Sequence, residues 1–182
     1  MSLDAESTIE QVAAVVSDTL TQAGITAVLS GGAAVQIYTS GIYESKDLDF
    51  VAAASNRELE RALKSLDFER MQGSRHFLHP TCQYTLEFPT WPIAIGDEVL
   101  KEWGERSVGA LRIQILTPTQ CAMDRLAAFY HWSDRQALDQ AVLVATQQTV
   151  DIMEIEQWSI REGRSTEFTE FAARVARKRS SL

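Results

Sequence analysis

The sequence predicts an α/β protein of the α+β type, with a mixed β-sheet core followed by a C-terminal helical bundle. Two observations support this fold class. Up to about residue 116, short apolar or alternating segments typical of strands interchange with segments of helical periodicity. After residue 116, helix-start signals follow one another with no strand-like segment between them. We therefore expect an α/β core at 1–116 and a helical region at 117–182 that packs on it.

The composition indicates one compact domain. The chain has 182 residues, of which 45% are hydrophobic and 23% charged, and it contains only 9 Gly, 4 Pro and 2 Cys. These values exclude collagen-like, low-complexity and disulfide-scaffold proteins. No apolar run reaches the roughly 18 residues that a membrane span requires, and the N-terminus does not resemble a signal peptide. We expect a cytoplasmic protein that does not contact a membrane, with Cys82 and Cys121 as free thiols.

Local patterns place the elements of the core. The apolar residues of 5–23 recur at helical spacing, and Ser55 with Glu58 forms a capping box that opens a helix. Residues 89–109 carry no clear pattern. The expected helices are 5–23, 33–38 and 55–66, and the expected strands are 25–29, 47–53, 68–71, 75–78, 83–88 and 111–116.

Helix-start signals organise the second part. Thr117, followed by Pro118 and Gln120, predicts a helix to about residue 131. Asp134 caps a second helix to about residue 147, Asp151 with Glu154 opens a third, and Ser165 opens a fourth. The expected helices therefore begin near 118, 135, 152 and 165.

The segment 25–51 carries the chemistry. A glycine pair, Gly31-Gly32, directly follows a buried strand and begins a helix, so a phosphate can approach the backbone and the helix N-terminus closely. Asp47 and Asp49 lie on the next strand. Because side chains alternate along a strand, both carboxylates project to one side, about 7 Å apart. Carboxylates in this arrangement bind hard divalent cations such as Mg²⁺.

These residues resemble the nucleotidyltransferase superfamily with the DNA-polymerase-β-like fold. The resemblance rests on Ser30-Gly31-Gly32 and on Asp47-Leu48-Asp49 at the spacing of that family. Within it, the chain is similar to the minimal bacterial AbiEii-type toxins of toxin–antitoxin systems, through Gly31-Gly32-Ala33-Ala34 and Ser45. The stretches beginning at Asp124-Arg125 and Asp134-Arg135 resemble the helical half of these toxins loosely.

The resemblance implies transfer of a nucleoside monophosphate from an NTP to a hydroxyl of RNA, a protein or a small molecule. It implies Mg²⁺ (or Mn²⁺) held by Asp47, Asp49 and a third acid. Glu87 is our candidate for that acid, because Tyr84, Leu86 and Phe88 would share the other face of its strand. Asp97 and Glu98 are alternatives. Ser30, Gly31, Gly32 and Lys46 are the candidate nucleotide-binding residues.

One departure keeps a second function open. Related toxins often carry Arg four residues before the first Asp, where this chain has Tyr43. Lys46, Arg75 or Arg125 would have to replace that cation. The alternative is a catalytically silent nucleotidyltransferase-like protein that acts by binding, for example to an antitoxin partner.

Three further groups receive structural interpretations. His76 and His79 would face opposite sides of a strand, so they do not predict a zinc site. The aromatic run 129–132 indicates packing. The net charge is −8, and the basic run 174–179 complements a helix C-terminus better than it predicts nucleic-acid binding.

Overall fold

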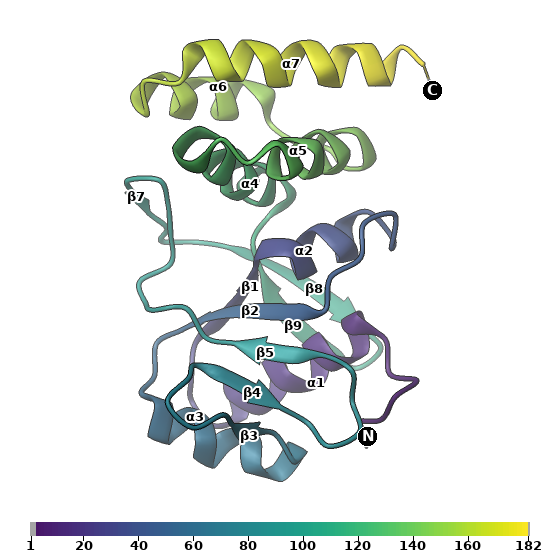
Figure 1. Cartoon of the computed structure of the whole chain (residues 1–182), viewed down its shortest axis with the longest axis vertical. Coiled ribbons are helices and arrows are strands. Elements are labelled where there is room, and N and C mark those ends of the chain that lie inside the picture. Colours follow the sequence, from purple (N-terminus) through teal and green to yellow (C-terminus); the bar gives the residue numbers. More distant parts are fainter. Residues whose placement is uncertain (1–2, 182) are drawn as a thin grey trace.

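A computed structural model of the chain describes residues 3–181 and confirms the α/β fold with a helical C-terminal region (Figure 1). The helices are α1 (Ile9–Gln22), α2 (Gly31–Tyr38), α3 (Asn56–Leu63), the 3₁₀ helix η1 (Lys64–Leu66), α4 (Pro118–Trp132), α5 (Arg135–Gln147), α6 (Ile152–Arg161) and α7 (Ser165–Arg179). The strands are β1 (Ala27–Ser30), β2 (Asp47–Ala52), β3 (Glu69–Arg70), β4 (His76–Leu78), β5 (Thr85–Glu87), β6 (Ala94–Ile95), β7 (Glu98–Val99), β8 (Gly104–Val108) and β9 (Leu111–Ile115).

The main sheet is mixed and has seven strands in the order β3-β4-β5-β2-β1-β9-β8. β2 is the middle strand, antiparallel to β1 and parallel to β5. β1 and β9 are also parallel, whereas the outer pairs β3–β4, β4–β5 and β8–β9 are antiparallel. At the centre of the sheet, the last residues of β1 and β5, Ser30 and Glu87, therefore lie on either side of Asp49 of β2.

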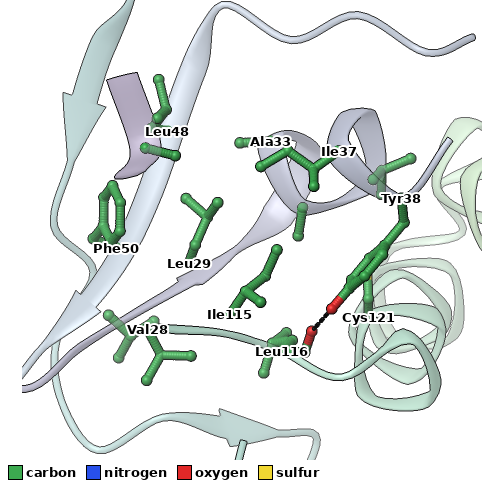
Figure 2. Packing of buried hydrophobic residues seen from close by; sticks show 14 of the residues in the cluster. Val28, Leu29, Ala33, Ile37, Tyr38, Leu48, Phe50, Ile115, Leu116 and Cys121 are labelled. Carbon is green, nitrogen blue, oxygen red and sulfur yellow. Dashed lines mark hydrogen bonds between the residues drawn. The ribbon is translucent and has the colours of Figure 1, made fainter. Parts of the chain in front are cut away.

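The core lies where the central strands meet α2 (Figure 2). Leu48 and Phe50 of β2 are fully buried, in agreement with the alternation along this strand. The hydroxyl of Tyr38, at the end of α2, donates a 2.6 Å hydrogen bond to the carbonyl of Leu116, which directly follows β9. This bond fixes α2 to the strand next to β1.

The helical region covers α2. α2 contacts β1 and β2 as well as α4 and α5, while α6 and α7 form the outermost layer (Figure 1). The β6–β7 hairpin reaches this region through Glu162, which accepts a 3.0 Å bond from the backbone N–H of Asp97 and lies 3.2 Å from His131. Within residues 3–181, no helix has the length and apolar character to cross a membrane.

The helix caps largely follow the sequence. The side chains of Thr117, Asp134 and Asp151 cap α4, α5 and α6 as expected. The expectation that Ser165 caps α7 is wrong, because Ser165 is the first helical residue and Arg164 occupies the cap position without a side-chain bond. The segment 89–109, which carries no clear sequence pattern, contains the short strands β6 and β7 and the edge strand β8.

Candidate active site

The two aspartates of β2 lie on the side of the strand opposite the core. Leu48 and Phe50 between and beside them are fully buried, whereas Asp47 is exposed and Asp49 half-buried. Ser45 orders the start of this strand: its hydroxyl donates to the carbonyl of Asp47 at 3.0 Å and accepts from the N–H of Asp47 at 3.3 Å. The serine two residues before the first aspartate therefore fixes the backbone that carries the carboxylates.

Gly31 lies directly against the carboxylate of Asp49. Gly31 is the first residue of α2 and has φ +64°, and a Cβ at this position would overlap Asp49 Oδ2. The hydroxyl of Ser30 does not cap α2 but donates to the carbonyl of Asp49 at 3.3 Å. The N-terminus of α2 therefore lies against Asp49 and has no side-chain cap.

Gly32 borders the loop that precedes β2. A Cβ on Gly32 would come within 3.0 Å of Ser45 Oγ and 3.3 Å of Tyr43 Cε1. Tyr43 thus packs beside the glycine pair. The backbone N–H of Ser45 donates to Gln36 Oε1 of α2 at 2.6 Å, so the loop is tied to the same helix.

Glu87 is the direct cross-strand partner of Asp49. The parallel register pairs Asp49 of β2 with Glu87 of β5, and the antiparallel register on the other side pairs Glu87 with His76 of β4. Ser30 of β1 is the partner of Asp49 on its remaining side. Because directly opposite residues share a face of the sheet, these four side chains form a row across four adjacent strands.

The carboxylate of Asp49 is in an unfavourable environment for its charge. Burial and, next, the neighbouring Glu87 carboxylate raise the pKa of Asp49 from 3.8 to about 6. Asp124 and Asp47 add to this effect, and Arg125 opposes it. Several negatively charged carboxylates therefore lie near Asp49, and Arg125 offsets only part of their effect on its pKa.

Arg125 reaches the site from the helical region. Its Nε and Nη2 donate to Asp124 Oδ2 at 2.9 and 2.6 Å, so the adjacent acid on α4 fixes the guanidinium. Burial lowers the pKa of Arg125, but Asp124 and, more weakly, Asp49 raise it above its usual value. Residues from both parts of the chain thus contribute to the electrostatics around Asp49.

Glu87 already has two partners in the protein. Its Oε1 lies 2.5 Å from Arg75 Nε, and its Oε2 lies 3.3 Å from His76 Nε2. The resemblance implies that Glu87 binds a metal, whereas the structure supplies Arg75 and His76 as its partners. Within the described part of the chain, no group of three or more His, Cys, Asp or Glu side chains converges on a position that could hold a metal ion.

The remaining candidates bond to residues other than the two aspartates. Lys46 Nζ donates to Gln83 Oε1 at 2.8 Å. Asp97 and Glu98 belong to the β6–β7 hairpin, where Asp97 bonds to Glu162 through its backbone and Glu98 pairs with Arg161 at 2.8 Å. The carboxylate of Glu98 is therefore paired with α6, whereas Asp97 is bonded to Glu162 through its backbone only.

Solved structures supply one informative comparison. Neither a protein-family model nor a curated protein matches the sequence. The chain is similar to the crystal structure of an antigenic nucleotidyltransferase-like protein from Paracoccidioides brasiliensis, with 16% sequence identity and a TM-score of 0.62. The alignment covers 98% of this chain and 92% of that one. The chain has a nucleotidyltransferase-like fold.

Sequence reasoning leaves two features of this nucleotidyltransferase-like fold open. Arg125 is one of three cations that could act at the site, and only the folded chain brings it close enough to Asp49 to lower the pKa of that carboxyl. The sequence gives His76 no site role, because its alternation with His79 argues against a zinc pair, and its pairing with Glu87 depends on the register of β4 and β5. His79 is directed elsewhere: its Nδ1 accepts from the backbone N–H of Cys82 at 2.9 Å, and its ring packs edge-on against Phe68.

Proposed function

We propose that the protein transfers a nucleoside monophosphate from an NTP to a hydroxyl acceptor. The main supporting observation is that Asp49 lies between Gly31, at the uncapped start of α2, and its cross-strand partner Glu87. A helix N-terminus without a side-chain cap accommodates phosphate oxygens. The overall fold, shared with a nucleotidyltransferase-like protein, supports the same conclusion.

The donor set fits a hard divalent cation in chemical type. Asp47, Asp49 and Glu87 offer only carboxylate oxygens, which are the ligands that hard divalent cations prefer. Burial first, and the neighbouring Glu87 carboxylate next, raise the pKa of Asp49, and a bound cation would offset the contribution of Glu87. We propose that these three residues hold Mg²⁺ (or Mn²⁺) once Glu87 leaves Arg75 and His76 and the three carboxylates turn toward one another, since they do not converge on one position in this structure. When bound, the metal would neutralise charge on the reacting phosphate.

The residues of the chain have separate tasks in this proposal. Gly31 and Gly32 let the triphosphate approach the backbone of α2, and Ser45 keeps the start of β2 in place. The acceptor oxygen forms a bond to the α-phosphorus while the bond between the α- and β-phosphates breaks, so that pyrophosphate leaves. Glu87, once released from its partners, is positioned to receive the proton of the acceptor hydroxyl.

A specific observation favours a second function. Both oxygens of Glu87 are engaged by Arg75 and His76, and Tyr43 stands where related toxins often have a cation. A protein that binds a nucleotide or a partner such as an antitoxin, without catalysis, would have no need to release Glu87.

Label transfer distinguishes the two functions. The protein would be incubated with each α-labelled NTP, Mg²⁺ or Mn²⁺, and total cellular RNA. Asp47→Asn and Asp49→Asn test the site, and Asp139→Asn is the matched control because Asp139 lies on α5 and pairs with Arg174 of α7. Label in RNA or protein that disappears in the first two variants and persists in the control supports transfer.

Two other results would contradict transfer. Label that persists in both site variants would place the chemistry elsewhere. Absence of label with every NTP, including assays with small hydroxyl compounds as acceptors, together with a nucleotide-dependent rise in melting temperature, would favour the silent binding protein.

A further inference from the structure

Arg75 stands in a distinct position among the cations around the site. Arg125 is fixed by Asp124, and Lys46 is bonded to Gln83. Arg75 directly precedes β4, its side chain is 59% exposed, and within residues 3–181 its one ion pair is with Glu87. Of these three cations, Arg75 is therefore the one whose ion pair is with a member of the row formed by Ser30, Asp49, Glu87 and His76.

The partners of Glu87 occupy the atoms that a ligand would need. Arg75 lies against Oε1 and His76 against Oε2, so neither carboxylate oxygen is free while both contacts persist. The Glu87 side chain is only 18% exposed, so these contacts are partly shielded from water. A divalent cation bound to Glu87 would repel the positively charged guanidinium, and the more exposed Arg75 is easier to move than His76.

We propose that Arg75 is a positioning residue that holds Glu87 in the free protein and turns to the phosphates of the nucleotide when Glu87 binds a divalent cation. This inference rests on the proposed function, since it concerns the same nucleotide and the same acid. A guanidinium can pair with a phosphate as well as with a carboxylate, so the exchange leaves Arg75 paired in both states. Arg75 would thereby supply the cation that position 43 lacks.

The exchange couples the binding of cation and nucleotide. In the absence of nucleotide, Arg75 competes with the cation for Glu87 and lowers its affinity. In the presence of nucleotide, the released guanidinium contacts a phosphate and raises nucleotide affinity. A favourable coupling between two ligands is reciprocal, so each ligand should tighten binding of the other.

Two binding measurements on the full chain test this coupling without an activity assay. Free Mn²⁺ would be followed by electron paramagnetic resonance, and a non-hydrolysable ATP analogue would be titrated calorimetrically with Mn²⁺ present. The variants are Arg75→Ala, Arg75→Lys and Glu87→Gln. Arg112→Ala is the matched control, because Arg112 forms an exposed pair with Glu105 in the β8–β9 hairpin.

The expected results move in opposite directions. Arg75→Ala should bind Mn²⁺ alone roughly three- to tenfold more tightly, the range for loss of a competing, partly shielded ion pair. The same variant should bind the analogue several-fold more weakly, and Arg75→Lys should restore part of that affinity. Arg112→Ala should match the wild-type protein in both measurements, and Glu87→Gln should weaken Mn²⁺ binding.

The outcomes separate this inference from the proposed function. Wild-type protein and Arg75→Ala could bind Mn²⁺ equally well while Glu87→Gln does not bind it. That result would overturn the role of Arg75 and would still support a metal site at Glu87. Absence of Mn²⁺ binding in every variant would overturn both. An affinity for Mn²⁺ that falls in Arg75→Ala would show a structural role for Arg75 and would also overturn the inference.

Discussion

Gly31 and Asp49 fit together so closely that no side chain other than hydrogen is compatible with their arrangement. The backbone of Gly31 has φ +64°, and a Cβ there would overlap Asp49 Oδ2. Two requirements, a left-handed backbone conformation and space for a carboxylate, therefore coincide at one residue. Both serve the placement of Asp49 beside the start of α2.

Gly31→Ala should consequently destabilise the protein more than an ordinary glycine substitution. The left-handed conformation costs an L-residue about 1–2 kcal/mol. The overlap with Asp49 adds to this cost, because the carboxylate or α2 must shift. The free energy of unfolding from urea denaturation measures the sum.

Gly109→Ala is the matched control for this substitution. Gly109 has φ +59°, and no atom lies within 4 Å of the position that a Cβ would take, so its replacement carries the backbone cost alone. The difference between the two variants isolates the contact with Asp49. Equal destabilisation of both would contradict the close approach.

Asp49→Asn should stabilise the protein at neutral pH. Because the pKa of Asp49 is raised from 3.8 to about 6 in the folded state, its protonated form favours folding. That contribution is fully present below pH 3.8 and is lost as the pH rises through about 6. An asparagine does not ionise, so the variant should gain on the order of 1–3 kcal/mol at about pH 8.

The pH series provides the check on this prediction. Urea denaturation of both proteins from about pH 3.5 to 8 should show a difference that grows with pH through this window. Asp47→Asn, which changes an exposed neighbour, should show a smaller difference. A gain of equal size at all pH values would place its origin outside the titration of Asp49.

Much of the fold could be predicted because its signals are local. The caps at Thr117, Asp134 and Asp151 and the alternation of β2 depend on residues close in the chain, and the structure contains all of them. The strands of 89–109 lack such signals. β6 and β7 have two residues each, and β8 is an edge strand whose half-buried and exposed residues show no apolar alternation.

The site was predictable in part for the same reason. Asp47, Asp49 and the glycine pair lie within one short segment, so spacing alone brings them to adjacent elements. The pairing of Glu87 with Asp49 on one side and with His76 on the other depends on strand order and register. The buried alternation of Tyr84, Leu86 and Phe88 excludes a shift of one residue, which would turn Glu87 to the opposite face. A shift of two residues keeps the face of Glu87 but changes its partners, and the sequence does not decide between such registers.

Arg125→Ala should affect both the charge balance and the stability of the site. Arg125 lowers the pKa of Asp49, so its removal should raise that pKa further. It would also leave Asp124, whose side chain is largely buried, without its two hydrogen bonds. The loss should cost on the order of 1–3 kcal/mol at neutral pH.

Carbon-detected NMR titration of the Asp49 carboxyl and urea denaturation measure the two effects separately. Arg125→Lys retains the positive charge, so it should keep most of the effect on the pKa of Asp49. It should lose the pair of hydrogen bonds that the guanidinium donates to Asp124. An unchanged Asp49 titration in Arg125→Ala would show that α4 does not act on the acids of β2.

Tyr38→Phe should loosen the attachment of α2, the helix whose start forms the candidate phosphate site. The buried Tyr38 hydroxyl donates to the Leu116 carbonyl at 2.6 Å, and burial raises the pKa of this phenol well above its usual value (Figure 2). Phenylalanine keeps the packing but leaves the carbonyl without its donor, a loss of about 1–2 kcal/mol. Tyr43→Phe is the control, because the Tyr43 hydroxyl forms no hydrogen bond with the described residues. Urea denaturation should therefore separate the two variants, and equal stability would show that the bond to Leu116 does not hold α2 in place.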